Sequence, residues 1–262
     1  MDFSELSHQR EIRESLNKIF SEKCSPEKLK NFDNEFKHDE KLYEFLATNG
    51  YLGLGINEKL NGSGEDLYDL GILFECLGFH AAPLCLTGCL VDVAQTLQKF
   101  SKNENHQSIV SSIANGEIYT SAILEPLNHD PENPTTTAVF DGEKIIINGT
   151  KYLSEISSLA KGILISASSN KGVILALVKT DNVELTQLTS TANSPLFKVE
   201  LKNVLIEEPD VVHEEGRGLE ALKYLLQINM VMRSYIALGV TNKMTSLIAS
   251  YTSEREQFGR VI

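Results

Sequence analysis

The strongest constraint on the fold is a long apolar helix predicted near the end of the sequence. From residue 219 to residue 251, apolar side chains recur at intervals of three and four, the spacing of a helical face. Between Tyr224 and Val240 they nearly encircle the helix, which is typical of a helix buried in a bundle or an interface. Monomers rarely expose apolar patches of that size. We therefore expect the helix to be covered by another chain or by a continuation of this one.

Sequence patterns divide the chain into three domains. Residues 1–116 show helical spacing and predict an N-terminal α-helical domain. Residues 117–208 contain short β-rich segments separated by turn dipeptides such as Asp141-Gly142 and Asn148-Gly149. No βαβ rhythm is present there, so we expect an antiparallel β-barrel or sandwich. Residues 209–262 predict the first helix of a C-terminal four-helix-bundle domain, and the expected fold class is multidomain α+β.

Charge and composition argue against several classes of function. The formal net charge is −12, from 24 basic and 36 acidic residues, so nucleic acid is not expected as a partner because phosphate contacts need a basic face. No apolar run approaches the roughly 20 residues that span a bilayer. The N-terminus lacks the basic and apolar regions of a signal peptide, and we expect a cytoplasmic protein. Four cysteines without a CxxC pair or nearby ligand companions predict no metal site.

Three short motifs stand at the joints between the predicted domains. The first is Ala122-Ile-Leu-Glu-Pro126, where the helical pattern gives way to the β-rich pattern. The second is Asn148-Gly-Thr-Lys151, followed by Tyr152-Leu-Ser154. The third begins with Arg233-x5-Gly239 and continues to Tyr251-Thr-Ser-Glu-Arg-Glu-Gln-Phe-Gly259. In this order, and over essentially the whole chain, these motifs resemble segments of the acyl-CoA dehydrogenase family, and Arg-Glu-Gln-Phe-Gly is the most specific of them.

The resemblance implies an FAD-dependent oxidoreductase of fatty acid metabolism. In that family an α-helical domain, a β-barrel and a four-helix domain enclose FAD and an acyl-CoA thioester. A carboxylate removes the α-proton while the β-hydride passes to the flavin, so general-base catalysis is combined with cofactor chemistry. The reduced flavin then passes electrons to an electron-transferring flavoprotein. The resemblance also implies a homo-oligomer, or a hetero-oligomer with another acyl-CoA dehydrogenase-like chain.

The resemblance also indicates which residues form the site. Residues that match cofactor-binding positions of the family are Ile123, Leu124, Ser154, Arg255 and Phe258. Arg255 matches an arginine that reaches across a subunit interface to the FAD pyrophosphate, which suits a guanidinium fork; the alternative is a surface arginine flanked by glutamates. Arg233 matches a substrate-side residue near the thioester and the base, and the alternative is a structural ion pair.

Some positions depart from the family pattern. Leu124 replaces a threonine whose hydroxyl bonds the flavin, His129 replaces a serine near the phosphates, and Leu153-Ser154-Glu155 replaces an aromatic-Ile-Thr run. No carboxylate of this chain can be assigned as the base, and the residue before Arg233 is Met232. Three alternatives therefore stay open. In the first, the chain is a dehydrogenase that takes its base from a continuation or from a partner. In the second, it is a non-catalytic partner subunit or a degenerate remnant of the family. In the third, it is a related flavin monooxygenase.

Overall fold

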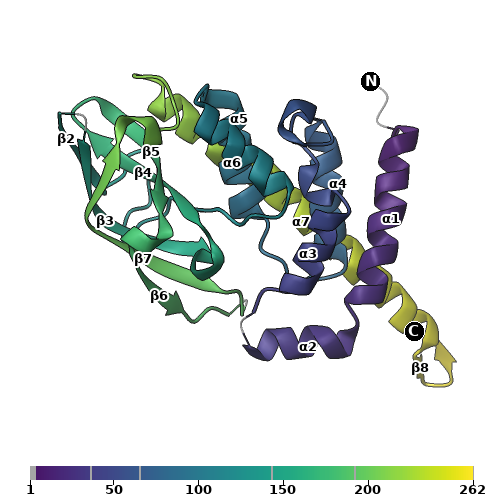
Figure 1. Cartoon of the computed structure of the whole chain (residues 1–262). Coiled ribbons are helices and arrows are strands. Elements are labelled where there is room, and N and C mark those ends of the chain that lie inside the picture. Colours follow the sequence, from purple (N-terminus) through teal and green to yellow (C-terminus); the bar gives the residue numbers. More distant parts are fainter. Residues whose placement is uncertain (1–3, 36, 65, 143, 192, 262) are drawn as a thin grey trace.

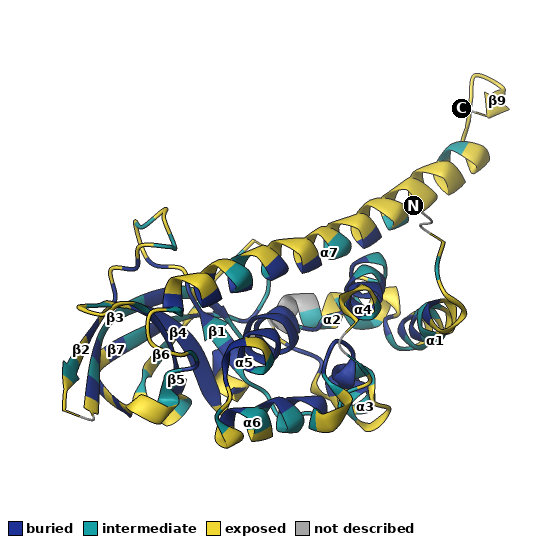
Figure 2. Cartoon of the chain, turned by 90° about the horizontal axis from the view of Figure 1, so that it is seen from above, coloured by how far each residue is buried: buried dark blue, intermediate teal, exposed yellow. Residues whose placement is uncertain are grey.

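The structure is a computed structural model that describes residues 4–35, 37–64, 66–142, 144–191 and 193–261. A helical domain and a curled β-sheet lie side by side, and one long helix runs along both of them (Figures 1 and 2). This arrangement confirms the predicted α+β fold class with a helical first part, a β-rich middle and a terminal helix. Among the described residues, no helix combines the length and apolar character that a membrane crossing requires.

In the described part of residues 1–116, the helical domain contains six α-helices and one π-helical segment, besides two short 3-10 turns. They are α1 (Ser7–Lys23), α2 (Pro26–Glu35), α3 (Glu40–Thr48), α4 (Leu67–Phe79), η3 (Thr87–Val93), α5 (Ala94–Phe100) and α6 (Glu104–Ala114). Helix α1 directs its apolar side chains inward, with Leu16 and Phe20 fully buried. Helix α4 begins after Asp66, whose carboxylate accepts the Tyr68 N–H at 2.7 Å and satisfies a free donor of the first turn. Sequence patterns missed α2, which is short and mostly polar.

The β-rich part forms one seven-stranded sheet. Its strands are β1 (Thr120–Ala122), β2 (Thr137–Asp141), β3 (Lys144–Glu155), β4 (Gly162–Ser169), β5 (Gly172–Lys179), β6 (Glu184–Leu188) and β7 (Leu196–Glu207). The order is β1-β4-β2-β3-β7-β6, and β5 pairs with the other edge of β4. Most pairs are antiparallel, as expected, but β1 and β2 both run parallel to β4. The sheet is therefore mixed, because β1 enters from the helical domain and is not joined to β4 by a hairpin.

A β-bulge shapes the end of β3. The pairing of β3 with β7 shifts register between Lys151 and Ser154, and Leu153 takes a left-handed backbone conformation with φ of 58°. Such a conformation is unusual for a residue with a branched side chain. The bulge re-aims the side chains of this strand end, as bulges commonly do near functional sites.

Helix α7 (Gly218–Glu254) contains 37 residues and is about 55 Å long at 1.5 Å per residue. Its first half packs on the helical domain and on β5, with Ala221, Leu225 and Met232 buried. Its second half projects past the rest of the molecule (Figure 2) and ends in the exposed hairpin β8 (Glu256–Gln257) and β9 (Arg260–Val261). Exposed apolar residues on this half are Met244, Leu247, Ile248 and Tyr251. Half of the predicted apolar helix thus lacks cover within the described residues.

Helices α4 and α7 cross at very short range through glycines. A Cβ atom added to Gly239 would lie 2.0 Å from the Glu75 carbonyl oxygen, and one added to Gly78 would lie 2.2 Å from the Ile236 carbonyl oxygen. Real Cβ atoms do not approach oxygen this closely. The two helices can therefore pack this closely only because Gly78 and Gly239 have no side chains.

His38 gives the helical domain a predicted pH dependence. Its buried ring accepts the Cys85 N–H at Nδ1, at 3.1 Å, and burial lowers the pKa of His38 to about 4 although Asp39 opposes this shift. In the unfolded chain His38 takes up a proton below about pH 6.5, whereas in the folded chain it does so only at a lower pH. The contribution of the neutral ring to the free energy of unfolding is therefore complete above about pH 6.5 and is lost as the pH falls. We expect a loss of roughly 2–3 kcal/mol between about pH 7 and pH 4 from this residue.

Urea unfolding across that pH range measures the effect. His38→Gln keeps a hydrogen-bond acceptor without the titration, so its stability should fall less steeply with acid than that of the wild type. His129→Gln, at an exposed histidine, is the matched control and should follow the wild-type slope. Equal slopes for all three proteins would show that His38 does not titrate as described.

Candidate functional site

A buried ion pair fixes the loop after β1 against β3. Lys151 Nζ lies 2.7 Å from Glu125 Oε1, and neither side chain is more than 1% exposed. Lys151 also donates to Ser166 Oγ at 3.0 Å, while Glu125 accepts from the N–H groups of Thr135 and Thr136. Burial lowers the pKa of Lys151 to about 8, against the effect of Glu125. Burial would raise the pKa of Glu125, but Lys151 and the neighbouring donors hold it well below its usual range.

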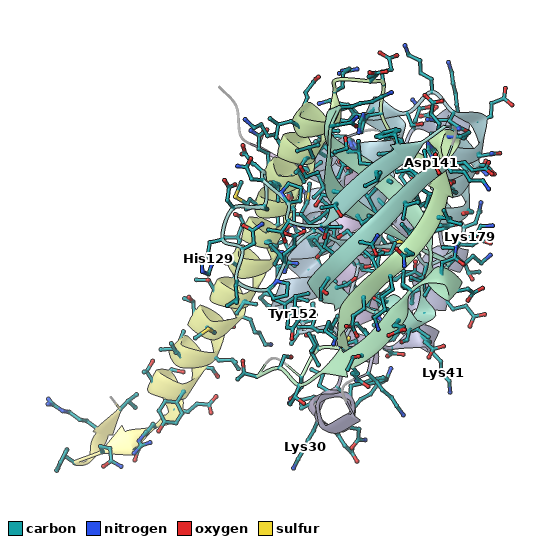
Figure 3. The ribbon with its side chains drawn as sticks, turned by 90° about the vertical axis from the view of Figure 1, so that its left-hand side faces the viewer. Lys30, Lys41, His129, Asp141, Tyr152 and Lys179 are labelled. Atoms are coloured by element: carbon teal, nitrogen blue, oxygen red, sulfur yellow. The ribbon has the colours of Figure 1, made fainter. Side chains whose placement is uncertain are left out.

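This ion pair holds an apolar edge of the sheet in place. Ile123 is buried, and its carbonyl accepts from Lys151 Nζ at 3.4 Å. The next carbonyl, of Leu124, accepts the Tyr152 N–H at 2.8 Å. The side chains of Leu124 and Leu153 remain 46% and 48% exposed, and we call these two residues the apolar edge. Figure 3 shows the labelled Tyr152 and His129 on the side of the sheet next to α7.

Ser154 lies beside the apolar edge but is directed inward. Its side chain is buried, and its hydroxyl donates to the Ser121 carbonyl at 2.7 Å. It also accepts from the Ser157 hydroxyl at 2.7 Å. A role of Ser154 in cofactor binding stays a prediction, and in this geometry its hydroxyl is engaged inside the sheet.

A hydrogen-bonded network joins the helical domain, the sheet and α7. Asp92 of η3 accepts from the Ser121 hydroxyl at 2.5 Å and from the Asn229 amide at 2.7 Å. The side-chain amide oxygen Oδ1 of Asn229 accepts from Arg233 Nε at 2.8 Å, and Arg233 Nη2 lies 3.2 Å from Glu155 Oε1. Burial raises the pKa of Asp92 to about 7. The predicted substrate-side residue Arg233 is thus in an ion pair, and we call the region around this network and the apolar edge the seam.

A cavity of about 560 Å³ opens close to the seam. Its walls come from α2, the end of α4, the loop before β7 and the middle of α7, and include Leu29, Lys30, Pro83, Cys85, Pro195 and Ile236. The Cys85 thiol lies close enough to Glu155 and Arg233 to interact with their charges, although burial is the main cause that raises its pKa. The size and mostly apolar lining are those of pockets for small ligands.

Two predicted cofactor-binding residues lie far from the seam. Arg255 follows Arg233 by 22 positions along α7, which corresponds to about 33 Å of helix. Its guanidinium lies over the Tyr251 ring, 5.2 Å from the centroid, and Phe258 in the hairpin is 100% exposed. One copy of the chain therefore brings Ile123, Leu124, Ser154 and Arg233 together but leaves Arg255 and Phe258 apart.

Sequence reasoning missed the residues that build the seam from inside. Glu125 and Lys151 lie in the first and second of the quoted motifs. The opposite charges of these two residues could have indicated that they form an ion pair. Asp92 and Asn229 belong to no motif and are 137 positions apart. Within the described part of the chain, no cluster of three His, Cys, Asp or Glu side chains could hold a metal ion.

Comparisons with known proteins agree with this architecture. Residues 7–117 match the family model described as the acyl-CoA dehydrogenase N-terminal domain. The chain is 23% identical to the probable acyl-CoA dehydrogenase YngJ of Bacillus subtilis, over 100% of this chain and 73% of the relative. It is 24% identical to the acyl-CoA dehydrogenase FadE27 of Mycobacterium tuberculosis, over 100% of this chain and 69% of that protein.

Solved structures show the same fold at similar levels of identity. The ChsE4-ChsE5 complex from Mycobacterium tuberculosis superposes with a TM-score of 0.91 and 23% identity, over 100% of this chain and 71% of that chain. The FAD complex of PigA superposes with a TM-score of 0.88 and 20% identity, over 100% of this chain and 72% of that chain. These likenesses extend the agreement from the N-terminal domain to the sheet and α7. Residues 7–117 therefore carry an acyl-CoA dehydrogenase N-terminal domain, and the whole chain is similar in sequence and fold to acyl-CoA dehydrogenases.

Proposed function

We propose that this chain is a subunit of an FAD-dependent acyl-CoA dehydrogenase-type enzyme that oxidises an acyl-CoA thioester between its α and β carbons. One observation carries the proposal: a ligand-sized cavity opens beside the seam, and its wall residue Cys85 lies close enough to Arg233 and Glu155 to interact with their charges. The match of residues 7–117 to the acyl-CoA dehydrogenase N-terminal domain, and the similarity of the whole chain to acyl-CoA dehydrogenases, support the reaction type. Arg233, Leu124 and Ile123 lie on that seam, at positions the sequence resemblance assigns to ligands.

The residues of the apolar edge fit a flavin ring. Leu124 and Leu153 present exposed apolar side chains on a backbone that the buried Glu125–Lys151 pair and the β3 bulge hold rigid. A flat aromatic ring system binds to such a surface by dispersion and by removal of apolar area from water. When bound, the flavin supplies the acceptor for the hydride. PigA, a structural neighbour, was solved as an FAD complex, and this also favours FAD here.

A second chain completes the cofactor site in this proposal. Arg255 and Phe258 lie at the far end of α7, about 33 Å from the seam of their own chain, so they can reach only a seam on another copy or a related partner. The exposed apolar residues Met244, Leu247 and Tyr251 give that half of α7 a surface suited to association. ChsE4-ChsE5, another neighbour, is a complex of two proteins. We propose a homo- or hetero-oligomer.

The acyl thioester is proposed to bind in the cavity beside the seam. Leu29, Pro83 and Ile236 offer apolar contacts for the acyl chain, and Arg233 lies one turn before Ile236 on the same helix. The guanidinium would stabilise negative charge that develops near the thioester. We propose that the proton acceptor comes from outside residues 1–262 and that an electron-transferring flavoprotein reoxidises the flavin.

Arg255→Ala is expected to weaken FAD retention. A guanidinium on the pyrophosphate makes charge-assisted hydrogen bonds, and their loss should raise the Kd for FAD about tenfold or more. Flavin fluorescence titration and the FAD content after desalting measure the change. Arg260→Ala, at another exposed arginine of the same hairpin, is the matched control and should bind FAD as the wild type does. Equal FAD affinity for the two variants would contradict the pyrophosphate role.

The reaction itself is tested by product analysis. The protein, with any partner that copurifies, is incubated with octanoyl-CoA, FAD and an electron-transferring flavoprotein or a dye acceptor. Mass spectrometry should detect a thioester that has lost two hydrogens. Octanoyl-CoA that is unchanged while the flavin is reduced by NADPH would instead favour a flavin monooxygenase.

A non-catalytic partner subunit is the second candidate function. It is favoured by the engagement of Ser154 with Ser121 and of Glu155 with Arg233, at positions where the family pattern has residues that meet the flavin. In that case the chain would be colourless when purified and would be recovered folded only with a related partner. Flavin bound to this chain alone would exclude that candidate.

A further inference from the structure

Asp92 is a buried carboxylate that the proposed cofactor and substrate contacts do not use. It is 4% exposed and lies in η3 between the fully buried residues Val91 and Val93. A buried carboxylate is costly unless hydrogen bonds offset its lost hydration. The contacts that do so come from Ser121 of β1 and Asn229 of α7, at 2.5 and 2.7 Å. Asp92 thus joins the helical domain to the other two parts of the fold.

The acceptor character of Asp92 fixes the orientation of the Asn229 amide. The oxygen that faces Asn229 accepts, so the amide NH₂ group must face Asp92 and the amide oxygen must face the other way. That oxygen accepts from Arg233 Nε at 2.8 Å. A reversed amide would direct its NH₂ group at the guanidinium, so that two donors would face each other. The orientation set by Asp92 therefore determines whether Arg233 has an acceptor on that side.

We infer that Asp92 is a positioning residue that holds the Arg233 guanidinium against Glu155 through the Asn229 amide. Arg233 Nη2 reaches Glu155 Oε1 at 3.2 Å, so the chain of contacts runs from the helical domain through α7 to the end of β3. The expected effect of Asp92 on thioester binding rests on the proposed function, in which Arg233 lies beside the thioester. Asp92 itself touches neither ligand in that proposal.

Three substitutions separate this role from a purely structural one. Asp92→Leu keeps the branched skeleton of heavy atoms, with two larger methyl groups in place of the carboxylate oxygens, and removes the acceptor. Asn229→Leu breaks the same link from α7. Asp92→Asn keeps an oxygen that can accept from Asn229 and should therefore preserve the amide orientation. Thr96→Val is the matched control, because Thr96 is equally buried near the same segment and its hydroxyl has no partner among the described residues.

Hydrogen exchange of the Arg233 Nε–H group, followed by NMR, reports its contact with Asn229 directly. The exchange rate should rise about tenfold or more in Asp92→Leu and Asn229→Leu, because a hydrogen bond to a charged donor is lost. It should stay at the wild-type value in Asp92→Asn and Thr96→Val. The Kd for octanoyl-CoA, measured by calorimetry on the complete protein, should rise about tenfold in the same two variants. The double variant should be no weaker than either single variant, as for two parts of one link.

Each outcome decides a separate claim. Wild-type exchange at Arg233 in folded Asp92→Leu would overturn the positioning role, and so would additive effects in the double variant. If Asp92→Leu does not fold, wild-type exchange in Asn229→Leu would have the same meaning. Faster exchange with an unchanged Kd for octanoyl-CoA would overturn the effect of Asp92 on thioester binding. Faster exchange in a protein whose wild type does not bind octanoyl-CoA would support the positioning role and reject the proposed function.

Discussion

Lys151→Met is expected to lower the free energy of unfolding by about 3–5 kcal/mol, because it leaves the buried Glu125 carboxylate without its countercharge. Both side chains are essentially inaccessible to solvent. The ammonium group also bonds Ser166 and the Ile123 carbonyl, so its loss frees the strand that carries the apolar edge. Urea unfolding followed by circular dichroism measures the effect.

Two further proteins show whether the loss arises from the unpaired charge. Lys161→Met removes a lysine from an exposed pair with Glu117, just before the strands β4 and β1, and should change the stability little, because solvent screens exposed ion pairs. The double variant Glu125→Gln/Lys151→Met removes the stranded charge and should recover part of the loss. Similar stabilities for Lys151→Met and Lys161→Met would contradict the assignment of this pair to the interior.

Gly239→Ala is expected to destabilise the fold by roughly 1–3 kcal/mol, the range of an overpacked core position. In most helices alanine is more stabilising than glycine by about 1 kcal/mol. The expected change in the free energy of unfolding therefore has the opposite sign to the change that helix propensity alone predicts. The added Cβ would lie 2.0 Å from the Glu75 carbonyl oxygen and 2.7 Å from the Phe79 amide nitrogen. Because these neighbours are backbone atoms of α4, one of the two helices must move.

Thermal unfolding and limited proteolysis of α7 test this crossing. Ser246→Ala, at an exposed position one heptad further along the same helix, should be as stable as the wild type or slightly more stable. Gly239→Ala should unfold at lower temperature and be cleaved faster within α7. A Gly239→Ala protein more stable than the wild type would show that the helices do not approach as closely as described.

The sequence predicted where the long helix lies but not which half of it is covered. Ala221, Leu225 and Met232 follow the same spacing as Met244 and Tyr251, yet only the first three are buried by this chain. Periodicity identifies an apolar face, whereas the chain that covers it depends on tertiary contacts. The parallel pairing of β1 with β4 could not be predicted from the sequence either, because the residues of a three-residue strand do not indicate its direction.

The site was predictable only where a motif marks it. Arg233 was identified from its motif, and the structure adds the ion pair with Glu155 that had been kept as the alternative. Asp92 and Asn229 could not be found, because an aspartate amid buried valines and a polar residue on an apolar helix are each unremarkable alone. Their roles come from an encounter between η3 and α7 that only the fold creates.

The central claim is that the seam holds a flavin next to an acyl thioester. Anaerobic addition of octanoyl-CoA to the FAD-loaded protein, with any partner that copurifies, tests it most directly. The account predicts that the yellow flavin absorbance is lost as the thioester is oxidised, and that it returns when an electron acceptor is added. A folded protein that holds FAD and keeps its full flavin absorbance at saturating octanoyl-CoA, or one that binds no FAD at all, would contradict it.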